Sequence, residues 1–221
     1  MARGAFFDVD YTILASNSGS LFIKYMRRQG QIKTWQILAS LYYLARYKLN
    51  LLEFEPLAER EVLKYEGQPE QEMIALCEEW YRQMVVDYIY PGARRMLADH
   101  AQQGDIPVLL SAATVYLVRP LAEDLGIQHY LCNRLEVAEG IFTGRLVKPL
   151  CYGQGKIHWA ESKARELGIS LEDSYYYSDS ITDLPVLERF GHPVAVNPDP
   201  LLRKQALARG WPMIRFRLDD Q

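Results

Sequence analysis

Several features that mark specialised classes of protein are missing from this 221-residue sequence. It has three cysteines, an odd number without a C-x-x-C pair, so neither a disulfide framework nor a zinc site is supported. Such sparse cysteine usage is typical of a reducing cytoplasm. Positive charge is not in excess either, because 25 Lys and Arg face 28 Asp and Glu. This balance disfavours nucleic acid as a partner.

Long apolar runs are also absent. The longest covers residues 35–45 and ends at Arg46, which is too short for an integral membrane segment. The N-terminus lacks the apolar stretch and cleavage site of a signal peptide, so we expect no export and a cytoplasmic location. With 49% hydrophobic and 24% charged residues, the chain is too apolar for disorder and long enough to bury a full core.

The order of apolar segments predicts a parallel α/β fold with a helical insertion. Residues 5–9 form a short apolar strand, whereas residues 13–90 have a helical and aromatic pattern, with one helix face over residues 35–49 and another helix after Pro69. From residue 90 onward strands alternate with helices, which indicates a sheet covered on both faces. The pattern predicts strands at 106–110, 174–177 and 193–196, short strands within 131–147 with turns at 139–140 and 143–144, and helices at 93–103, 115–125, 156–167, 184–190 and 201–208.

Two carboxylates follow the first apolar strand. On an extended chain Asp8 and Asp10 point the same way, and neighbouring carboxylates repel each other. A hard divalent cation such as Mg²⁺ would compensate, or one acid would keep its proton through a raised pKa. A plain strand-end turn with solvated acids is the alternative.

Three further signals fall at strand ends or helix starts. Ser111 is followed by small residues that would let backbone N–H groups approach an anion, or it caps the next helix. Lys156 opens a helix after a Gly-Gln-Gly turn and could reach a phosphate. Asp179 and Asp183 follow a third strand, as an N-cap pair or as two more metal-facing acids. The carboxyl ends of parallel strands meet at one edge of a sheet, so these groups should gather there.

The order of acid pair, serine, lysine and acid pair resembles the haloacid dehalogenase-like hydrolase superfamily, in its phosphoserine phosphatase-like branch. The resemblance covers nearly the whole chain, including the segment 191–198. It implies a doubly wound, Rossmann-like core of residues 1–15 and 89–221, with an α-helical cap of residues 16–88. It also implies a phosphatase that hydrolyses a small phosphorylated metabolite.

The resemblance implies a role for each acid. Asp8 would be the nucleophile and form an aspartyl-phosphate, and Asp10 would be the general acid and base. The Asp8 carboxylate, the Asp10 carbonyl and Asp179 would hold Mg²⁺. Asp183 would ligate it more weakly or orient a bound water.

The resemblance also assigns the polar groups around the acids. Ser111 and the Ala112 N–H would hold phosphoryl oxygens, Lys156 would offset charge between Asp8 and the phosphate, and Thr12 would tie down the first loop beside the substrate. Two residues depart from the family pattern, because many members have Gly or Ser where Tyr11 stands and Gly where Ser178 stands. Glycine adopts positive φ more cheaply, so only local backbone freedom is in question.

The cap is expected to select the substrate. Asn17, a candidate substrate-binding residue, stands where phosphoserine phosphatases carry a Glu for the substrate amine. Glu61 stands where they carry an Arg for the carboxylate, although a shift of one residue would place Arg60 there. Both changes count against phosphoserine as the substrate.

Residues 13–52 carry six basic side chains and no acid, interleaved with aromatic ones. A solvated helix face over an aromatic core is the favoured interpretation, and peripheral contact with anionic lipid or grip on an anionic substrate is the alternative. Three other functions stay open: phosphoserine phosphatase proper, a phosphatase for (lyso)phospholipid headgroups, and a phospho-acceptor signalling module. The last carries similar residues in another order and has no large cap.

Overall fold

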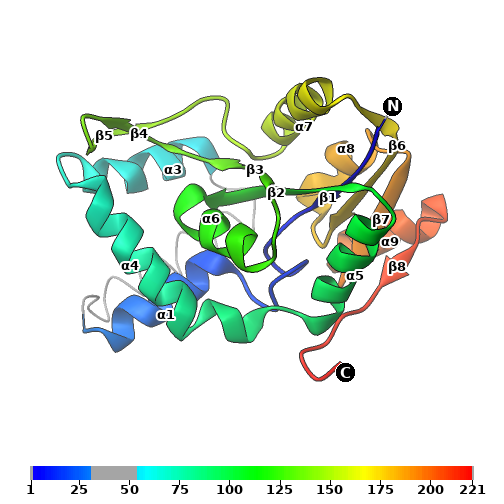
Figure 1. Ribbon diagram of the computed structural model, residues 1–221, viewed down its shortest axis with the longest axis horizontal. Helices are drawn as coiled ribbons and strands as arrows, with labels where there is room; N and C mark the ends of the chain where they lie inside the picture. Colours follow the sequence, from blue (N-terminus) through cyan, green and yellow to red (C-terminus); the bar gives the residue numbers. More distant parts are fainter. Residues whose placement is uncertain (1, 31–53, 221) are drawn as a thin grey trace.

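A six-stranded parallel sheet forms the centre of the computed structural model, which describes residues 2–30 and 54–220. The strand order is β3-β2-β1-β6-β7-β8 (Figure 1). The chain winds outward from β1 to β3 and then returns to the other side of β1 at β6, so the winding reverses between β1 and β6. This confirms the predicted doubly wound α/β fold. The strands are β1 (Ala2–Phe7), β2 (Ile106–Thr114), β3 (His129–Asn133), β6 (Ile169–Ser178), β7 (His192–Val196) and β8 (Met213–Ile214).

Helices cover both faces of the sheet because consecutive strand residues point to opposite sides. On β1, Phe7 packs into a core with residues of α5 and α6, whereas Phe6 packs with residues of α7, α8 and α9. Two separate apolar layers result, one on each face. The helices of these layers are α5 (Pro91–Gln102), α6 (Val115–Asp124), α7 (Gln154–Leu167), α8 (Leu184–Leu187) and α9 (Pro200–Arg209).

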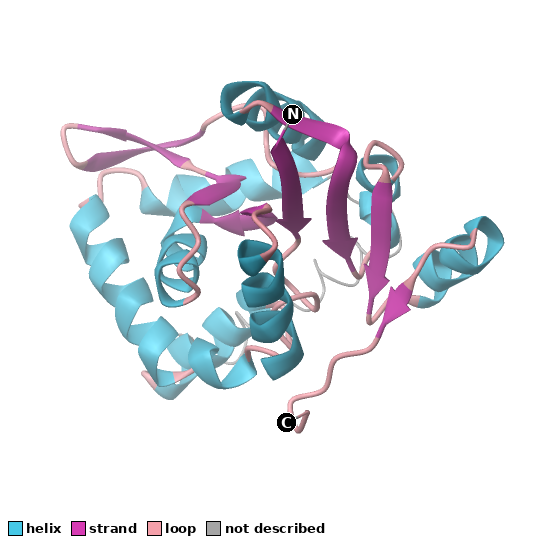
Figure 2. Ribbon diagram, turned by 45° about the vertical axis from the view of Figure 1, so that its right-hand side comes forward, coloured by secondary structure: helices cyan, strands magenta, loops and turns pink. Residues whose placement is uncertain are grey.

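A second group of helices lies between β1 and β2 in the sequence and beside the sheet in space (Figure 1). The hairpin of β4 (Leu135–Ala138) and β5 (Ile141–Leu146) reaches away from the sheet towards them (Figure 2). Phe142 N donates to Gln68 O at 3.0 Å, and Gly67 N donates to Phe142 O at 2.9 Å. A segment from the second half of the chain therefore joins the residues predicted to form the cap. The helices are α1 (Ser18–Arg28), α3 (Phe54–Val62) and α4 (Glu70–Gln83), with 3-10 turns at Leu63–Tyr65, Val85–Tyr88 and, after β6, Ile181–Asp183.

Several local predictions were wrong. The turn expected at Thr143-Gly144 lies inside β5, where a register irregularity across the hairpin absorbs Gly144 with φ of 75°. The helix expected over 184–190 ends at Leu187. Strand β6 begins at Ile169 instead of 174, because its start pairs with Ala2 before a register shift. The predicted helix face over residues 35–49 lies outside the described residues.

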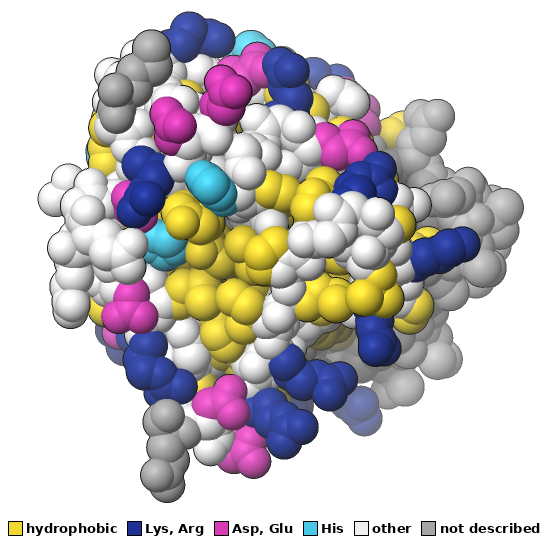
Figure 3. All heavy atoms as spheres, turned by 90° about the vertical axis from the view of Figure 1, so that its right-hand side faces the viewer, with side chains coloured by type: hydrophobic (Ala, Val, Ile, Leu, Met, Phe, Trp, Pro, Cys, Tyr) yellow, Lys and Arg dark blue, Asp and Glu magenta, His cyan; other side chains and the backbone are white. Residues whose placement is uncertain are grey.

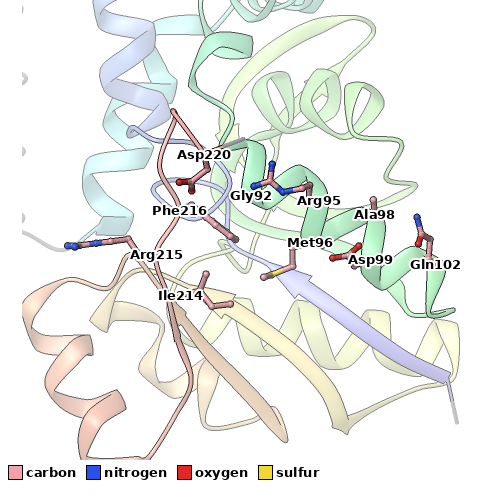
Figure 4. Close-up of a pocket in the computed structure, with 10 residues that line it drawn as sticks. All are labelled: Gly92, Arg95, Met96, Ala98, Asp99, Gln102, Ile214, Arg215, Phe216 and Asp220. Carbon is pink, nitrogen blue, oxygen red and sulfur yellow. The ribbon is translucent and has the colours of Figure 1, made fainter.

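The C-terminal segment crosses the start of α5 (Figure 4). Phe216 lies so close to Gly92 that a Cβ there would be 2.5 Å from the ring, and Phe216 N donates to Asn197 Oδ1 at 3.1 Å. Gly92 therefore permits the tail to pack on the helix. The face at this end of the molecule has hydrophobic side chains at its centre and charged ones around them (Figure 3).

A buried polar cluster joins the end of α5 to the sheet. His100 contacts the Asp105 carboxylate through Nδ1 and the Tyr177 hydroxyl through Nε2, each at 2.7 Å, and Arg3 Nε donates to Asp105 at 2.5 Å. Burial raises the pKa of Asp105, but the hydrogen bonds from Arg3 and His100 outweigh it and hold the pKa below its ordinary value. The carboxylate therefore stabilises the folded state.

We expect Asp105→Asn to lower the free energy of unfolding by about 1–3 kcal/mol at pH 7, because buried donors lose a charged acceptor. The folded pKa lies below the unfolded one, so this stabilisation is complete above the unfolded pKa of about 3.9 and is lost as the pH falls through the folded pKa. In urea unfolding, the difference in the free energy of unfolding between variant and wild type should be smaller at pH 3 than at pH 7. Asp99→Asn, at an exposed position of α5, is the control. An equal loss in both variants at pH 7 would contradict the assignment.

Candidate active site

The predicted site residues gather where the winding of the sheet reverses. Asp8 directly follows β1, Ser111 lies in the last part of β2, and Asp179 directly follows β6. Asp8 N donates to Tyr177 O at 2.9 Å, which fixes the end of β1 beside β6. Lys156 lies in the first turn of α7 and reaches the same edge. The crevice outside the carboxyl ends of parallel strands is where ligands bind in such folds.

Lys156 is the centre of a buried ion-pair network. Its Nζ donates to Asp8 Oδ1 at 2.8 Å and to Asp183 Oδ2 at 2.7 Å. Only 2% of Lys156 is exposed. Burial by itself lowers the pKa of this amine, but Asp183 and Asp8 raise it well above the ordinary value. Lys156 is therefore a permanent positive charge between two carboxylates. The close start of α7 requires Gly155, because a Cβ there would lie 1.8 Å from Leu150 O.

Asp183 is held by more than the lysine. Its Oδ2 also accepts from the Tyr176 hydroxyl at 2.6 Å and from Ser178 Oγ at 2.8 Å. Tyr176 was not singled out from the sequence, and Ser178 was noted only as a departure from the family pattern, although strand alternation puts residues two apart on the same face. Asp183 thus positions Lys156 in this structure, and its role toward a metal stays a prediction.

Asp10 is bound by the first turn of α1. Its carboxylate accepts from Asn17 Nδ2 at 2.7 Å, from Ser18 N at 2.9 Å and from Ser18 Oγ at 3.1 Å. Burial raises the pKa of Asp10 to about 6, and the Ser18 hydrogen bonds oppose this shift. Asn17 Oδ1 accepts from Ser20 N at 3.0 Å, so both ends of this amide are used within the chain. Direct contact between Asn17 and a substrate stays a prediction.

The loop after Asp10 is fixed by its backbone. The N–H groups of Ile13 and Leu14 both donate to Val9 O at 2.9 Å. The Thr12 hydroxyl, expected to tie down this loop, is buried and has no hydrogen-bond partner among the described residues. Tyr11 has φ of 57°, a conformation that costs a non-glycine residue about 1–2 kcal/mol. Its departure from the family pattern therefore carries a local backbone cost.

The end of β2 is fixed by Asn133, which the sequence analysis missed. Asn133 Nδ2 donates to Ala112 O at 2.6 Å, and its Oδ1 accepts from Cys151 N at 2.7 Å. Ser111 Oγ accepts from Ala113 N at 3.1 Å. One buried amide at the end of β3 thus joins β2 to the loop before α7, beside Ser111. The binding of phosphoryl oxygens by Ser111 and the Ala112 N–H stays a prediction.

The site gathers more carboxyl groups than one lysine can offset. The pKa of Asp179 is raised mainly by burial and, to a smaller extent, by neighbouring carboxylates. The pKa of Asp8 is also raised by burial, and Lys156 opposes this shift. Within residues 2–30 and 54–220, no three His, Cys, Asp or Glu side chains are grouped closely enough to hold a metal alone. Mg²⁺ commonly takes one or two carboxylates and keeps several waters, so a site with a backbone carbonyl fits these residues.

Comparison with known proteins identifies the family. Residues 5–188 match the haloacid dehalogenase-like hydrolase family. The chain belongs to this family. It is 34% identical to a phosphoserine phosphatase of Mycobacterium tuberculosis over 99% of this chain and 72% of that protein. It is 27% identical to a histidinol-phosphatase of Neisseria meningitidis over 98% of this chain and 100% of that protein. The family and these phosphatase relatives together show that the chain is a phosphoric monoester hydrolase.

Solved structures share the fold of this chain. A protein of unknown function from Bordetella pertussis shares 30% identity and a TM-score of 0.89 over 99% of both chains. A phosphoserine phosphatase with a phospho-aspartyl intermediate analogue has a TM-score of 0.70 and 20% identity over 96% of this chain and 93% of that one, and so shares the fold. None of the described helices of our chain has the length and apolar character needed to span a membrane.

We expect Lys156→Met to lower the free energy of unfolding by about 3–5 kcal/mol at pH 8 in metal-free protein, because two buried carboxylates lose their cation. Urea denaturation followed by circular dichroism measures the loss. Lys163→Met is the matched control on the same helix, because Lys163 pairs with the exposed Glu166. Its loss should stay within about 0.5 kcal/mol. Equal stability of the two variants would show that the buried network is not needed for folding.

Proposed function

We propose that the protein is a Mg²⁺-dependent phosphatase that hydrolyses a small phosphomonoester through an aspartyl-phosphate on Asp8. The observation that supports this most is the contact of Lys156 with both Asp8 and Asp183 at the reversal point of the sheet. Phosphoryl transfer needs positioning and charge neutralisation more than covalent chemistry, and this site supplies both.

The first half of the reaction transfers the phosphoryl group to the protein. Asp8 Oδ attacks phosphorus, a new P–O bond forms, and the bond from phosphorus to the leaving alcohol oxygen breaks. Asp10, held by Asn17 and Ser18, gives its proton to that oxygen. In the second half, Asp10 takes a proton from water as the water attacks phosphorus and releases Asp8. A pKa of about 6 suits a group that must both give and take a proton near neutral pH.

Three groups would hold Mg²⁺: the Asp8 carboxylate, the Asp10 carbonyl and Asp179, with Asp183 farther out. Bound there, the cation would neutralise charge on the phosphoryl oxygens. Lys156 keeps Asp8 oriented and offsets its charge against the approaching phosphate. Ser111 and the Ala112 N–H would bind the remaining phosphoryl oxygens. The Thr12 hydroxyl, which has no partner among the described residues, lies in the loop after Asp10.

The other functions considered differ in their support. A signalling module would stop after one phosphorylation, whereas both named relatives above are phosphatases. One relative is a phosphoserine phosphatase and the other is a histidinol-phosphatase, so phosphoserine and histidinol phosphate are substrates to test. Lipid contact would involve the basic aromatic segment of residues 13–52. Residues 31–52 of this segment lie outside the described residues.

We expect Asp8→Asn to reduce kcat with p-nitrophenyl phosphate by at least about a thousandfold, because an amide forms no acyl phosphate. Mass spectrometry of acid-quenched wild type should show one added phosphoryl group on Asp8, and the variant should show none. Circular dichroism should show that the variant is folded. If the variant kept even about a tenth of the wild-type kcat, Asp8 would not be the nucleophile.

We also expect activity to disappear with EDTA and to return with Mg²⁺, because burial and mutual repulsion leave the site acids in need of a cation. Ca²⁺ should inhibit, since its larger and looser coordination shell misplaces the nucleophile. Thermal unfolding should give a higher Tm with saturating Mg²⁺ than with EDTA, and Asp179→Asn should reduce this difference. Full activity after exhaustive chelation would refute the metal assignment.

A further inference from the structure

A cavity of about 450 Å³ opens beside the proposed catalytic residues. Asp10 and Ala112 form part of its wall, and the rest comes mainly from α1, α3, α4, α6 and β2–β5. Its position next to the general acid makes it the place for the leaving alcohol of the substrate. Its size is in the range of pockets that enclose whole small ligands.

Aromatic side chains form much of this wall. Phe22 and Trp80 pack edge to face, with ring centroids 5.1 Å apart and planes at 72°. Tyr65 and Tyr116 also line the cavity, and the Tyr116 hydroxyl is held by Glu70 at 2.9 Å. Rings fixed in this way offer faces and edges to a flat apolar group, and their faces attract cations.

The charges on the wall have one sign. Among the described residues that line the cavity there is no Lys, Arg or His, whereas Asp10 and Glu61 are both present. Glu61 comes from α3, and Arg60 beside it is not part of the lining. The structure thus favours Glu61 over Arg60 as the residue that faces the substrate. Glu61 also pairs with Lys64, but both side chains are about half exposed, and such surface pairs are weak.

We infer that this cavity takes a leaving group with an aromatic ring and a positive charge and without a carboxylate; the inference rests on the proposed phosphatase function. A ring would replace water against Phe22, Tyr65 and Trp80. An ammonium or imidazolium would pair with Glu61. A carboxylate would be buried near two acids and would lose its hydration without gaining a cation from the described residues of the lining. Glu61 is thus a specificity-determining residue.

Four phosphomonoesters test the effects of the ring, the positive charge and the carboxylate separately. Histidinol phosphate has a ring and an amine, 2-phenylethyl phosphate has only the ring, phosphoethanolamine has only the amine, and phosphoserine adds a carboxylate to the amine. We expect kcat/KM to be highest for histidinol phosphate and lowest for phosphoserine, with at least about a hundredfold between them. Phosphoserine at or above histidinol phosphate would overturn the inference.

The variant Glu61→Gln isolates the charge. It should lower kcat/KM for histidinol phosphate by roughly fivefold and leave 2-phenylethyl phosphate unchanged, because only the former carries a cation. Glu59→Gln is the matched control, since Glu59 is on the same helix, pairs with Lys148 and does not line the cavity. An equal loss for both substrates, or no loss for either, would overturn the role of Glu61.

Turnover of p-nitrophenyl phosphate distinguishes a failure of this inference from a failure of the proposed phosphatase function. Its leaving group needs no proton and carries no positive charge, so an active phosphatase should turn it over whatever charge the cavity prefers. No turnover of any of these esters with Mg²⁺ would refute the phosphatase itself. Turnover of p-nitrophenyl phosphate with a preference for phosphoserine would refute only the leaving-group assignment.

Discussion

The site depends on one buried cation among several acids. Lys156 lies between Asp8 and Asp183, and removal of any partner would leave an uncompensated charge away from water. This constraint explains the surrounding hydrogen bonds. Tyr176 and Ser178 satisfy Asp183, and Gly155 lets the first turn of α7 approach closely enough for the lysine to reach both carboxylates.

The same constraint links folding to chemistry. A nucleophilic carboxylate must be desolvated enough to approach a phosphate, yet it must stay ionised. Lys156 supports the ionised form of Asp8 against burial, but the neighbouring Asp183 and Asp10 work in the opposite direction. A single lysine does not balance that many acids, which supports the proposal that the site binds further positive charge. A divalent cation and a phosphate ester, taken together, would complete the charge balance.

The site residues that the sequence could predict are those near strand ends and helix starts. Asp8 and Asp179 each follow a strand, Ser111 lies in the last part of a strand, and Lys156 lies in the first turn of a helix. Parallel topology brings such positions to one edge of the sheet. Asn133 could not be found in this way, because its importance lies in contacts to Ala112 and Cys151 that are distant in sequence. The same limit applies to the β4–β5 hairpin, whose pairing with Gly67 and Gln68 no local periodicity reveals.

Helix α1 connects Asp10, the proposed proton donor, with the cavity proposed for the leaving group. Its cap residue Asn17 and its first residue Ser18 hold the Asp10 carboxylate, and Phe22, one turn later, lines the cavity against Trp80. Residues four apart on a helix lie on the same face, so a leaving group that contacts Phe22 also contacts the helix that orients Asp10. In the proposed mechanism, recognition of the alcohol and delivery of its proton are therefore two properties of one helix turn. In this proposal the amide of Asn17 holds Asp10, and Glu61 selects the charge of the substrate.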